Sequence, residues 1–275
     1  MTRSRLGRVL SRPRAALGLG FTGLLVGLAL AAPLLAAHDP LALTKGAELA
    51  PPSRQFPFGT DELGRDIFSR VLFGARTSLT VAFVSVLIAS MVGVLVGLAS
   101  GYCGGYVDGI VMRLIDTILA FPAMLLAMAI VSLLGPSSFN AMLAVAVVGV
   151  PTYARLTRAS VLAEKGKEYV EAARAIGAAD GYIVFRTILP NVLTPVMIQL
   201  TVSMGYAVLL EAGLSFLGLG TQPPTPSWGA MLFTASSYLY QAPWYGLYPG
   251  LFLTILILGL NLISEGVQEA LSRSV

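Results

Sequence analysis

Apolar stretches separated by shorter polar segments divide the chain into six candidate membrane spans. A helix that crosses the hydrocarbon core of a bilayer needs about 20 mostly apolar residues, and most of these stretches reach that length. The fourth is shorter and ends where Pro151 and Arg155 interrupt the apolar run. The six spans are expected at about Ala15 to Ala37, Ser78 to Ser100, Leu114 to Leu134, Asn140 to Tyr153, Val192 to Leu217 and Tyr245 to Ile263. The pattern predicts an all-α integral membrane protein with six transmembrane helices.

Composition agrees with a lipid environment. Of the 275 residues, 56% are hydrophobic and 12% are charged, whereas a soluble domain carries about 25% charged residues. The single cysteine, Cys103, excludes an internal disulfide framework. The single histidine, His38, lies in a polar stretch without ligand partners at metal spacing, so no metal site is expected.

The first span follows a run of arginines, as the apolar core of a secretory signal would. Its apolar stretch of about 23 residues exceeds the 7–15 that are usual for such a signal, so we expect it to remain as a membrane helix.

The distribution of basic residues predicts which side each segment faces. With the N-terminus inside, the inner segments hold Arg3, Arg5, Arg8, Arg12, Arg14, Arg113, Arg155, Arg158, Lys165, Lys167, Arg174, Arg186 and Arg273. The outer segments then hold only Lys45, Arg54, Arg65, Arg70 and Arg76. Because cytoplasmic loops carry the excess of Lys and Arg, both termini are expected in the cytoplasm. Residues 1–14 then form a cytoplasmic N-terminal segment, and an outer loop covers 38–77.

The inner segment 155–191 is the most polar part of the chain after the N-terminus. Residues 168–176 favour a helix, and Gly177 is a plausible stop. Asp180 is expected to cap a second short helix that Pro190 limits. The result is a helix-turn-helix along the inner face, where Ala172, Ala173 and Ile176 form a small apolar stripe that a groove on another protein could accept. A plain amphipathic helix resting on lipid headgroups is the alternative.

A motif within this segment points to a family. Glu171-Ala172-Ala173, then Gly177, then Leu189-Pro190 resembles the EAA motif of permease subunits of binding-protein-dependent ABC importers. The motif lies between the fourth and fifth spans, on the side that charge predicts to be cytoplasmic. One departure is Thr187, where isoleucine is usual.

Two further segments are similar to the dipeptide/oligopeptide/nickel permease family, and specifically to its second, "C"-type subunit. One precedes the second span, and the other follows Glu211 at the exit of the fifth. They read Phe58-Gly59-Thr60-Asp61 with Gly64-Arg65-Asp66, and Glu211-Ala212-Gly213 with Gln222-Pro223-Pro224 and Trp228-Gly229. The resemblance covers the chain after residue 14, although Ser264-Glu265-Gly266 stands where Gly-Asp-Gly is common.

The resemblance implies a transmembrane domain over residues 15–275 in a prokaryotic cytoplasmic (inner) membrane, with no nucleic acid as partner. It implies a pathway shared with a sister permease, two ATPase subunits that hold ATP and Mg²⁺, and an external substrate-binding protein. The coupling segment 155–191 would dock the ATPases through Glu171, Ala172, Ala173, Ile176, Gly177 and Asp180. Di- or oligopeptides are the expected cargo; nickel, metal chelates and glutathione-like cargo remain alternatives within the family.

This chain carries no phosphate-binding loop of the form Gly-x-x-x-x-Gly-Lys-Ser/Thr, since Lys167 is followed by Glu168. It is therefore expected to have no ATPase activity and no cofactor of its own. A self-sufficient secondary transporter would show internal repeats and charged groups near the midplane, and a membrane enzyme would need a nucleophile with a base. Neither pattern is found, so both classes are disfavoured.

Glu211 is the one acidic residue deep in an apolar run, where a carboxylate needs water or a partner. It is a candidate pathway residue together with Met204 and Tyr206 of the same span. Bonding to the Gly-rich turn that follows is an equally open reading for Glu211, and packing is an alternative for the other two.

Two more patterns have open readings. Arg65, Asp66 and Arg70 are candidates for contact with the binding protein, or for internal ion pairs that fix the outer loop. The second span carries small residues every four positions, which predicts a helix-packing seam rather than a pore lining; they are Ser85, Ala89, Gly93, Gly97, Gly101 and Gly105.

Overall fold

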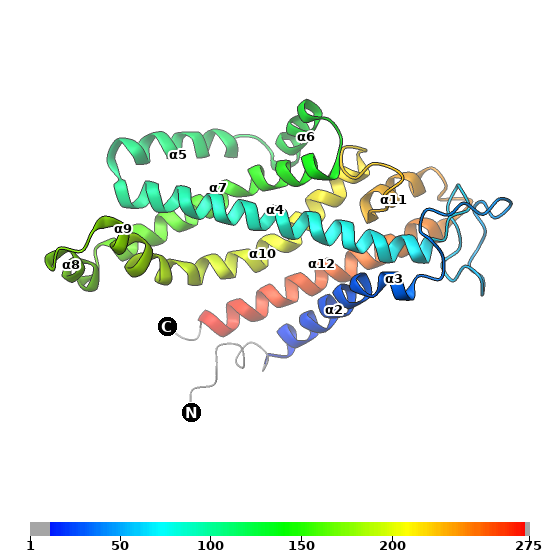
Figure 1. Ribbon diagram of the computed structural model, residues 1–275, viewed down its shortest axis with the longest axis horizontal. Helices are drawn as coiled ribbons and strands as arrows, with labels where there is room; N and C mark the ends of the chain where they lie inside the picture. Colours follow the sequence, from blue (N-terminus) through cyan, green and yellow to red (C-terminus); the bar gives the residue numbers. More distant parts are fainter. Residues whose placement is uncertain (1–11, 273–275) are drawn as a thin grey trace.

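The computed structural model describes residues 12–272, and all regular structure in that range is helical (Figure 1). The short connecting helices are α3 (Ala32–Leu35), α8 (Glu168–Ala175), α9 (Asp180–Tyr182) and α11 (Trp228–Ser236). The longer ones are α2 (Pro13–Leu30), α4 (Ile67–Cys103), α5 (Gly105–Leu119), α6 (Ala123–Leu134), α7 (Ser138–Lys165), α10 (Leu189–Phe216) and α12 (Pro243–Ser272). The all-α prediction is confirmed. Arg3, Arg5, Arg8 and Arg273 of the predicted inner charge set lie outside the described residues.

Five of these helical segments are long and apolar enough to cross a membrane. The predicted third span is not one helix, because α5 and α6 meet at an angle of 92°. Pro122 stands at the bend, where its missing N–H and ring prevent the helix from continuing. Counted as one broken span, α5 and α6 bring the number to six.

Two predicted boundaries were wrong by several turns. The second span begins at Ile67 rather than Ser78, because the Asp66 carboxylate caps the helix by accepting from the Ser69 N–H at 3.0 Å. The predicted outer loop 38–77 therefore ends at Asp66. The fourth span continues through Pro151 to Lys165; neighbouring helices in a bundle make an internal proline tolerable.

α4 and α7 pack against each other along a seam of small residues. A Cβ atom placed on Gly97 would lie 2.6 Å from the Thr157 Cβ, and one on Gly101 would lie 2.9 Å from the Val161 Cβ. Glycine is therefore required for this close approach. The predicted packing seam is confirmed as far as Gly101, whereas Gly105 begins α5 and faces open space.

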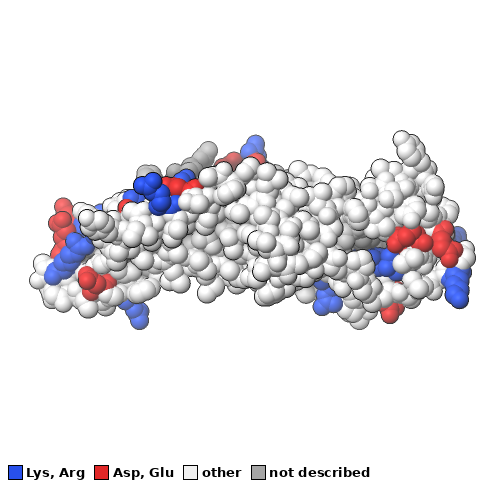
Figure 2. All heavy atoms as spheres, turned by 90° about the horizontal axis from the view of Figure 1, so that it is seen from above, with Lys and Arg blue, Asp and Glu red and all other residues white. Residues whose placement is uncertain are grey.

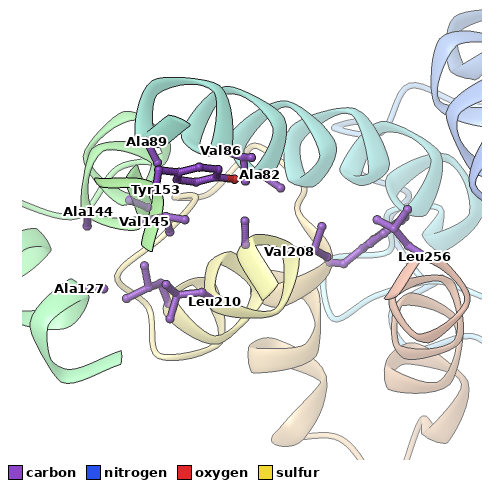
Figure 3. Packing of buried hydrophobic residues seen from close by; sticks show 14 of the residues in the cluster. Ala82, Val86, Ala89, Ala127, Ala144, Val145, Tyr153, Val208, Leu210 and Leu256 are labelled. Carbon is purple, nitrogen blue, oxygen red and sulfur yellow. The ribbon is translucent and has the colours of Figure 1, made fainter. Parts of the chain in front are cut away.

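The buried core lies where α4, α7 and α10 meet. Figure 3 shows the Tyr153 ring of α7 beside Val86 and Ala89 of α4. Tyr153 is 1% exposed, and Leu210 of α10 is 5% exposed. Side chains from all three helices meet in this core, which fixes α4, α7 and α10 relative to one another.

The two ends of the elongated bundle differ in what they carry (Figure 1). One end carries α8 and α9, and the first turn of α2 and the last turns of α12 are directed toward it. The opposite end carries the irregular segment 36–66 and the chain around α11. Figure 2 shows charged side chains gathered toward both ends, with a mostly uncharged middle. An uncharged belt of this kind suits the hydrocarbon layer of a membrane.

Candidate functional site

α8 is a helix of eight residues at the end of the molecule, between α7 and α9. Val170 is fully buried against the bundle, and Ala173 is partly buried. Glu171 and Ala172 are exposed, and Ile176 at the end of the helix is 85% exposed. The helix therefore uses one face to hold its place and presents the opposite face outward.

Gly177 ends α8, as the sequence predicts. Its φ of +81° lies in the left-handed region, and the Ala178 N–H donates to the Ala173 carbonyl at 3.1 Å. No heavy atom lies within 4 Å of a Cβ placed on Gly177. Glycine is needed here for its backbone conformation, because the neighbouring space is open.

Asp180 does not cap a second short helix, which corrects the prediction. Ala179 is the N-cap residue, and no side-chain cap bond is made. The Asp180 carboxylate instead accepts from the Tyr102 hydroxyl at 2.5 Å. α9 also does not stop before Pro190: it passes through a π-helical turn, Ile183–Ile188, directly into α10. Pro190 follows this π-helical turn directly, and a local π adjustment of this kind accommodates its missing N–H.

Glu211 lies inside the bundle and is 1% exposed. Its Oε1 accepts from the Ser215 hydroxyl at 2.8 Å, and Ser215 Oγ accepts from the Thr221 N–H at 3.1 Å. This chain of hydrogen bonds ties α10 to the Gly-rich turn that follows it. The geometry favours the turn-fixing reading of Glu211 over the pathway reading.

Met204 and Tyr206 lie on different faces of α10 and do not join Glu211 in one site. Met204 lines a groove of about 560 Å³ with Thr22 of α2 and Arg76 of α4. Tyr206 is 52% exposed and borders a cavity of about 60 Å³ near Tyr153. The three predicted pathway residues are therefore not brought together.

Arg65, Asp66 and Arg70 are all buried, with exposures of 7%, 2% and 6%. The Asp61 carboxylate receives Arg65 Nε at 2.6 Å and Arg70 Nε at 3.2 Å. Arg70 also donates to the Pro40 carbonyl at 3.0 Å. These contacts favour internal ion pairing over contact with a binding protein. The side chains hold the segment 36–66 against α4, and they are not exposed at the surface.

Two ion pairs between α5 and α7 were not predicted from the sequence. Arg158 donates to both carboxylate oxygens of Asp108 at 2.5 Å, and Ser100 of α4 also donates to Asp108. Arg155 pairs with Asp116 at 2.5 Å. A helix continued past Pro151 places Arg155 and Arg158 on one face, which would have called for two acidic partners.

No group of three or more His, Cys, Asp or Glu side chains within residues 12–272 is placed to hold a metal ion.

Comparison with known proteins gives consistent matches. Residues 93–275 match the family described as the binding-protein-dependent transport system inner membrane component. The di/tripeptide transport system permease protein DppC of Pseudomonas aeruginosa (strain UCBPP-PA14) is 44% identical over 260 residues, covering 92% of this chain and 86% of that protein. The glutathione transport system permease protein GsiD of Escherichia coli O6:K15:H31 is 43% identical over 224 residues, covering 82% and 74%.

Solved structures agree in fold. The inward-facing MetNI methionine ABC transporter contains a chain with a TM-score of 0.59 and 20% identity, covering 73% of this chain and 96% of that chain. A crystal structure of an amino acid ABC transporter with histidines gives a TM-score of 0.55 at 16% identity, covering 71% and 91%.

Proposed function

Because the chain belongs to the family of binding-protein-dependent transport system inner membrane components, we propose that it is the second permease of an ATP-driven importer for di- or oligopeptides. In this family the permease is a multi-pass inner-membrane component and the ATPase is a separate subunit. The permease domain covers residues 15–275, and residues 1–14 form a cytoplasmic segment.

The observation that carries the proposal is the outward face of α8. Glu171, Ala172 and Ile176 project from the end of the molecule, and Gly177 turns the chain back toward α10. Small apolar residues beside one acidic group suit a shallow groove on another protein. We assign this face, continued to Asp180, to docking of the ATPase subunits, which bind ATP and Mg²⁺.

The charge distribution supports a cytoplasmic position for α8. Lys165 and Lys167 precede it and Arg174 lies in its last turn, and the first turn of α2 and the end of α12 are directed to the same end (Figure 1). Under the positive-inside rule this end faces the cytoplasm. Both termini then lie inside, and the segment 36–66 lies outside with the substrate-binding protein.

The apolar surface of α5 and α6 supports a sister permease as partner. Ile115 is the one buried residue of α5, whereas Tyr106 is 93% exposed and Leu133 of α6 is 88% exposed. Contiguous apolar surface on a membrane protein faces lipid or another helix bundle. A pathway between two permeases would use such a face, and half-exposed Tyr206 remains a candidate to line it.

The transport step follows from the position of α8. ATP binding would draw the two ATPases together, shift α8 on each permease and open the pathway outward; hydrolysis would reset it. Since α10 follows α9 without a break, a shift of α8 and α9 is passed directly into a membrane-spanning helix.

Peptide cargo is supported by the relatives named as di/tripeptide and dipeptide permeases, at 44% and 43% identity. A glutathione-like cargo is the second candidate, because relatives named for glutathione transport reach 43–46%. Glutathione is itself a tripeptide, so both candidates share the chemistry of a small peptide.

The test is purification of this chain from its native membrane in mild detergent, with mass spectrometry of the proteins that accompany it. We expect a sister permease and one or two P-loop ATPases. The complex, reconstituted with its binding protein, should take up labelled Ala-Ala in an ATP-dependent manner, and unlabelled glutathione as competitor distinguishes the two candidates.

Recovery of the chain alone, or only with copies of itself, would contradict the proposal. A self-powered secondary transporter would then become the leading hypothesis.

A further inference from the structure

Two tyrosines hold the two ends of α8. Tyr102, near the end of α4, contacts the C-terminal part of α8 and the start of α9. Tyr169, in the first turn of α8, contacts α7 and α10. We call Tyr102, Tyr169 and their polar partners the tyrosine clasp.

Tyr102 brings four helices together. Its hydroxyl donates to the Asp180 carboxylate of α9 at 2.5 Å. The Arg174 guanidinium carbon of α8 lies 5.9 Å from the centre of the Tyr102 ring, within cation–π range. The Lys165 ammonium of α7 lies 5.2 Å from the same ring centre and donates to the Tyr102 carbonyl.

Tyr169 makes a second junction at the other end of α8. Its hydroxyl donates to the Glu164 carboxylate of α7 and accepts from the Asn191 side-chain amide of α10 at 3.1 Å. Lys167 also donates to Glu164 at 2.7 Å. Partial burial and the adjacent carboxylate raise the pKa of Tyr169 to about 12, so the phenol keeps its proton and remains a donor at neutral pH.

Apolar packing alone holds α8 weakly. Val170 is its one fully buried residue, and the rest of the helix is mostly alanine and charged side chains. One buried valine and the partly buried Ala173 give the eight-residue helix little apolar surface to resist a rotation. Contacts at both ends of α8 prevent such a rotation. A helix that transmits a rigid-body motion has to be held in this way.

From this geometry we infer that Tyr102 and Tyr169 are positioning residues that convert a displacement of α8 into movement of α4, α7 and α10. The inference rests on the proposed docking of ATPases at α8. Without the clasp, α8 would still bind the ATPases but would rotate in place. ATP would then be hydrolysed with less transport per ATP.

The test compares uptake of labelled Ala-Ala with ATP hydrolysis in the same proteoliposomes, using the full complex and its binding protein. Tyr102→Phe removes one hydroxyl and keeps the ring for Arg174 and Lys165. Tyr169→Phe removes the second junction. For each variant we expect at least about fivefold less uptake per ATP hydrolysed, the effect of losing one typical hydrogen bond, with normal recovery of the ATPases.

Two tyrosines serve as matched controls. Tyr106 of α5 is 93% exposed and Tyr182 of α9 is 59% exposed, and neither makes a polar contact with the described residues. Tyr106→Phe and Tyr182→Phe should leave uptake per ATP unchanged.

A double-mutant cycle tests whether Tyr102 acts through Asp180. In an Asp180→Ala background, Tyr102→Phe should cause no further loss, because the bond is already absent. A second full loss in that background would overturn the assigned partner.

Unchanged uptake per ATP in both Tyr102→Phe and Tyr169→Phe would overturn the inference and leave the proposed function intact. Loss of the ATPases from the purified variants, in proportion to the loss of uptake, would also overturn it, since the tyrosines would then belong to the docking surface. A wild-type complex without ATP-driven uptake would instead overturn the proposed function.

Discussion

The two ends of the bundle both carry charged clusters, but they place those charges in opposite surroundings. At the end with the segment 36–66, Asp61, Arg65 and Arg70 are almost wholly buried and satisfy one another. In the half of the bundle that carries α8, the Arg155–Asp116 pair between α5 and α7 has side chains that are 54% and 55% exposed. The first cluster is closed within the chain, whereas the second lies beside surfaces that remain open.

This contrast has an energetic meaning. An exposed ion pair contributes at most about 1 kcal/mol because water and salt screen it. Removing one partner of a buried pair costs about 3–5 kcal/mol, since a charge is left without compensation. The buried cluster beside the segment 36–66 is therefore suited to fixing a shape, and the exposed charges in the half with α8 to contacts that form and break.

The largest effect is expected for Asp61→Ala, which removes the shared partner of the buried cluster beside the segment 36–66. Both Arg65 and Arg70 lose their shared carboxylate, so stability should fall by about 3–5 kcal/mol. Thermal unfolding in detergent measures this loss. Arg54→Ala, an exposed change in the same segment, is the control and should stay within about 0.5 kcal/mol. Equal melting temperatures for the two variants would contradict the closed-cluster interpretation.

Gly177→Leu addresses the inner end. The left-handed backbone at Gly177 disfavours any side chain by about 1–3 kcal/mol, and leucine adds bulk where the ATPase is proposed to dock. We expect the chain to insert in the membrane but to lose ATP-driven uptake. Gly177→Ala imposes the same backbone strain with little bulk, so it separates the two causes. Normal transport by Gly177→Leu would rule out docking at this turn.

Substitutions of Glu211 distinguish a structural role of its buried carboxylate from a role in the transport pathway. Glu211→Gln keeps an oxygen that accepts from Ser215, so uptake should stay within about twofold. Glu211→Leu leaves the Ser215 hydroxyl without its acceptor and should cost about 1–3 kcal/mol in thermal unfolding. A complete loss of uptake in Glu211→Gln, with normal stability, would assign the carboxylate to the pathway after all.

The smallest effect is expected for Glu171→Ala on the open face of α8. One exposed acidic group in a protein contact is worth about 1 kcal/mol or less, so ATPase recovery should fall by no more than about fivefold. Recovery measured at low and high salt gives the size of the effect, which should shrink as salt rises. A loss of about 3–5 kcal/mol in the free energy of ATPase binding would equal the stability loss expected for Asp61→Ala and would remove the contrast between the two ends.

The sequence predicted the helical class, the seam of small residues and the turn at Gly177, because each depends on local pattern. It misplaced the start of α4 although Asp66 and Ser69 form a readable cap. It ended the fourth span at Tyr153, just after Pro151, whereas α7 continues to Lys165 because the rule that proline stops helices is weaker inside a bundle.

The partners of long-range hydrogen bonds and ion pairs could not be predicted from the sequence. The partnership of Arg158 with Asp108 spans 50 positions, and that of Tyr102 with Asp180 spans 78. Nothing local identifies such partners, because they depend on how α4, α5 and α7 are arranged. For the same reason the sequence left two readings open for Arg65, Asp66 and Arg70, which only their burial separates.

Among the described helices of 28 residues or more, α4 differs from the other three in one respect that bears on motion. α7, α10 and α12 each contain an internal proline, at Pro151, Pro195 and Pro249, whereas the 37 residues of α4 contain none. At 1.5 Å per residue, α4 is a strut about 55 Å long. Its first turn lies beside the ion pairs of Asp61 with Arg65 and Arg70, and its last turn contains Tyr102. A helix without an internal break tilts as a whole, so a displacement of its Tyr102 end moves its Asp66 end in the opposite direction, about a pivot near the small-residue seam with α7.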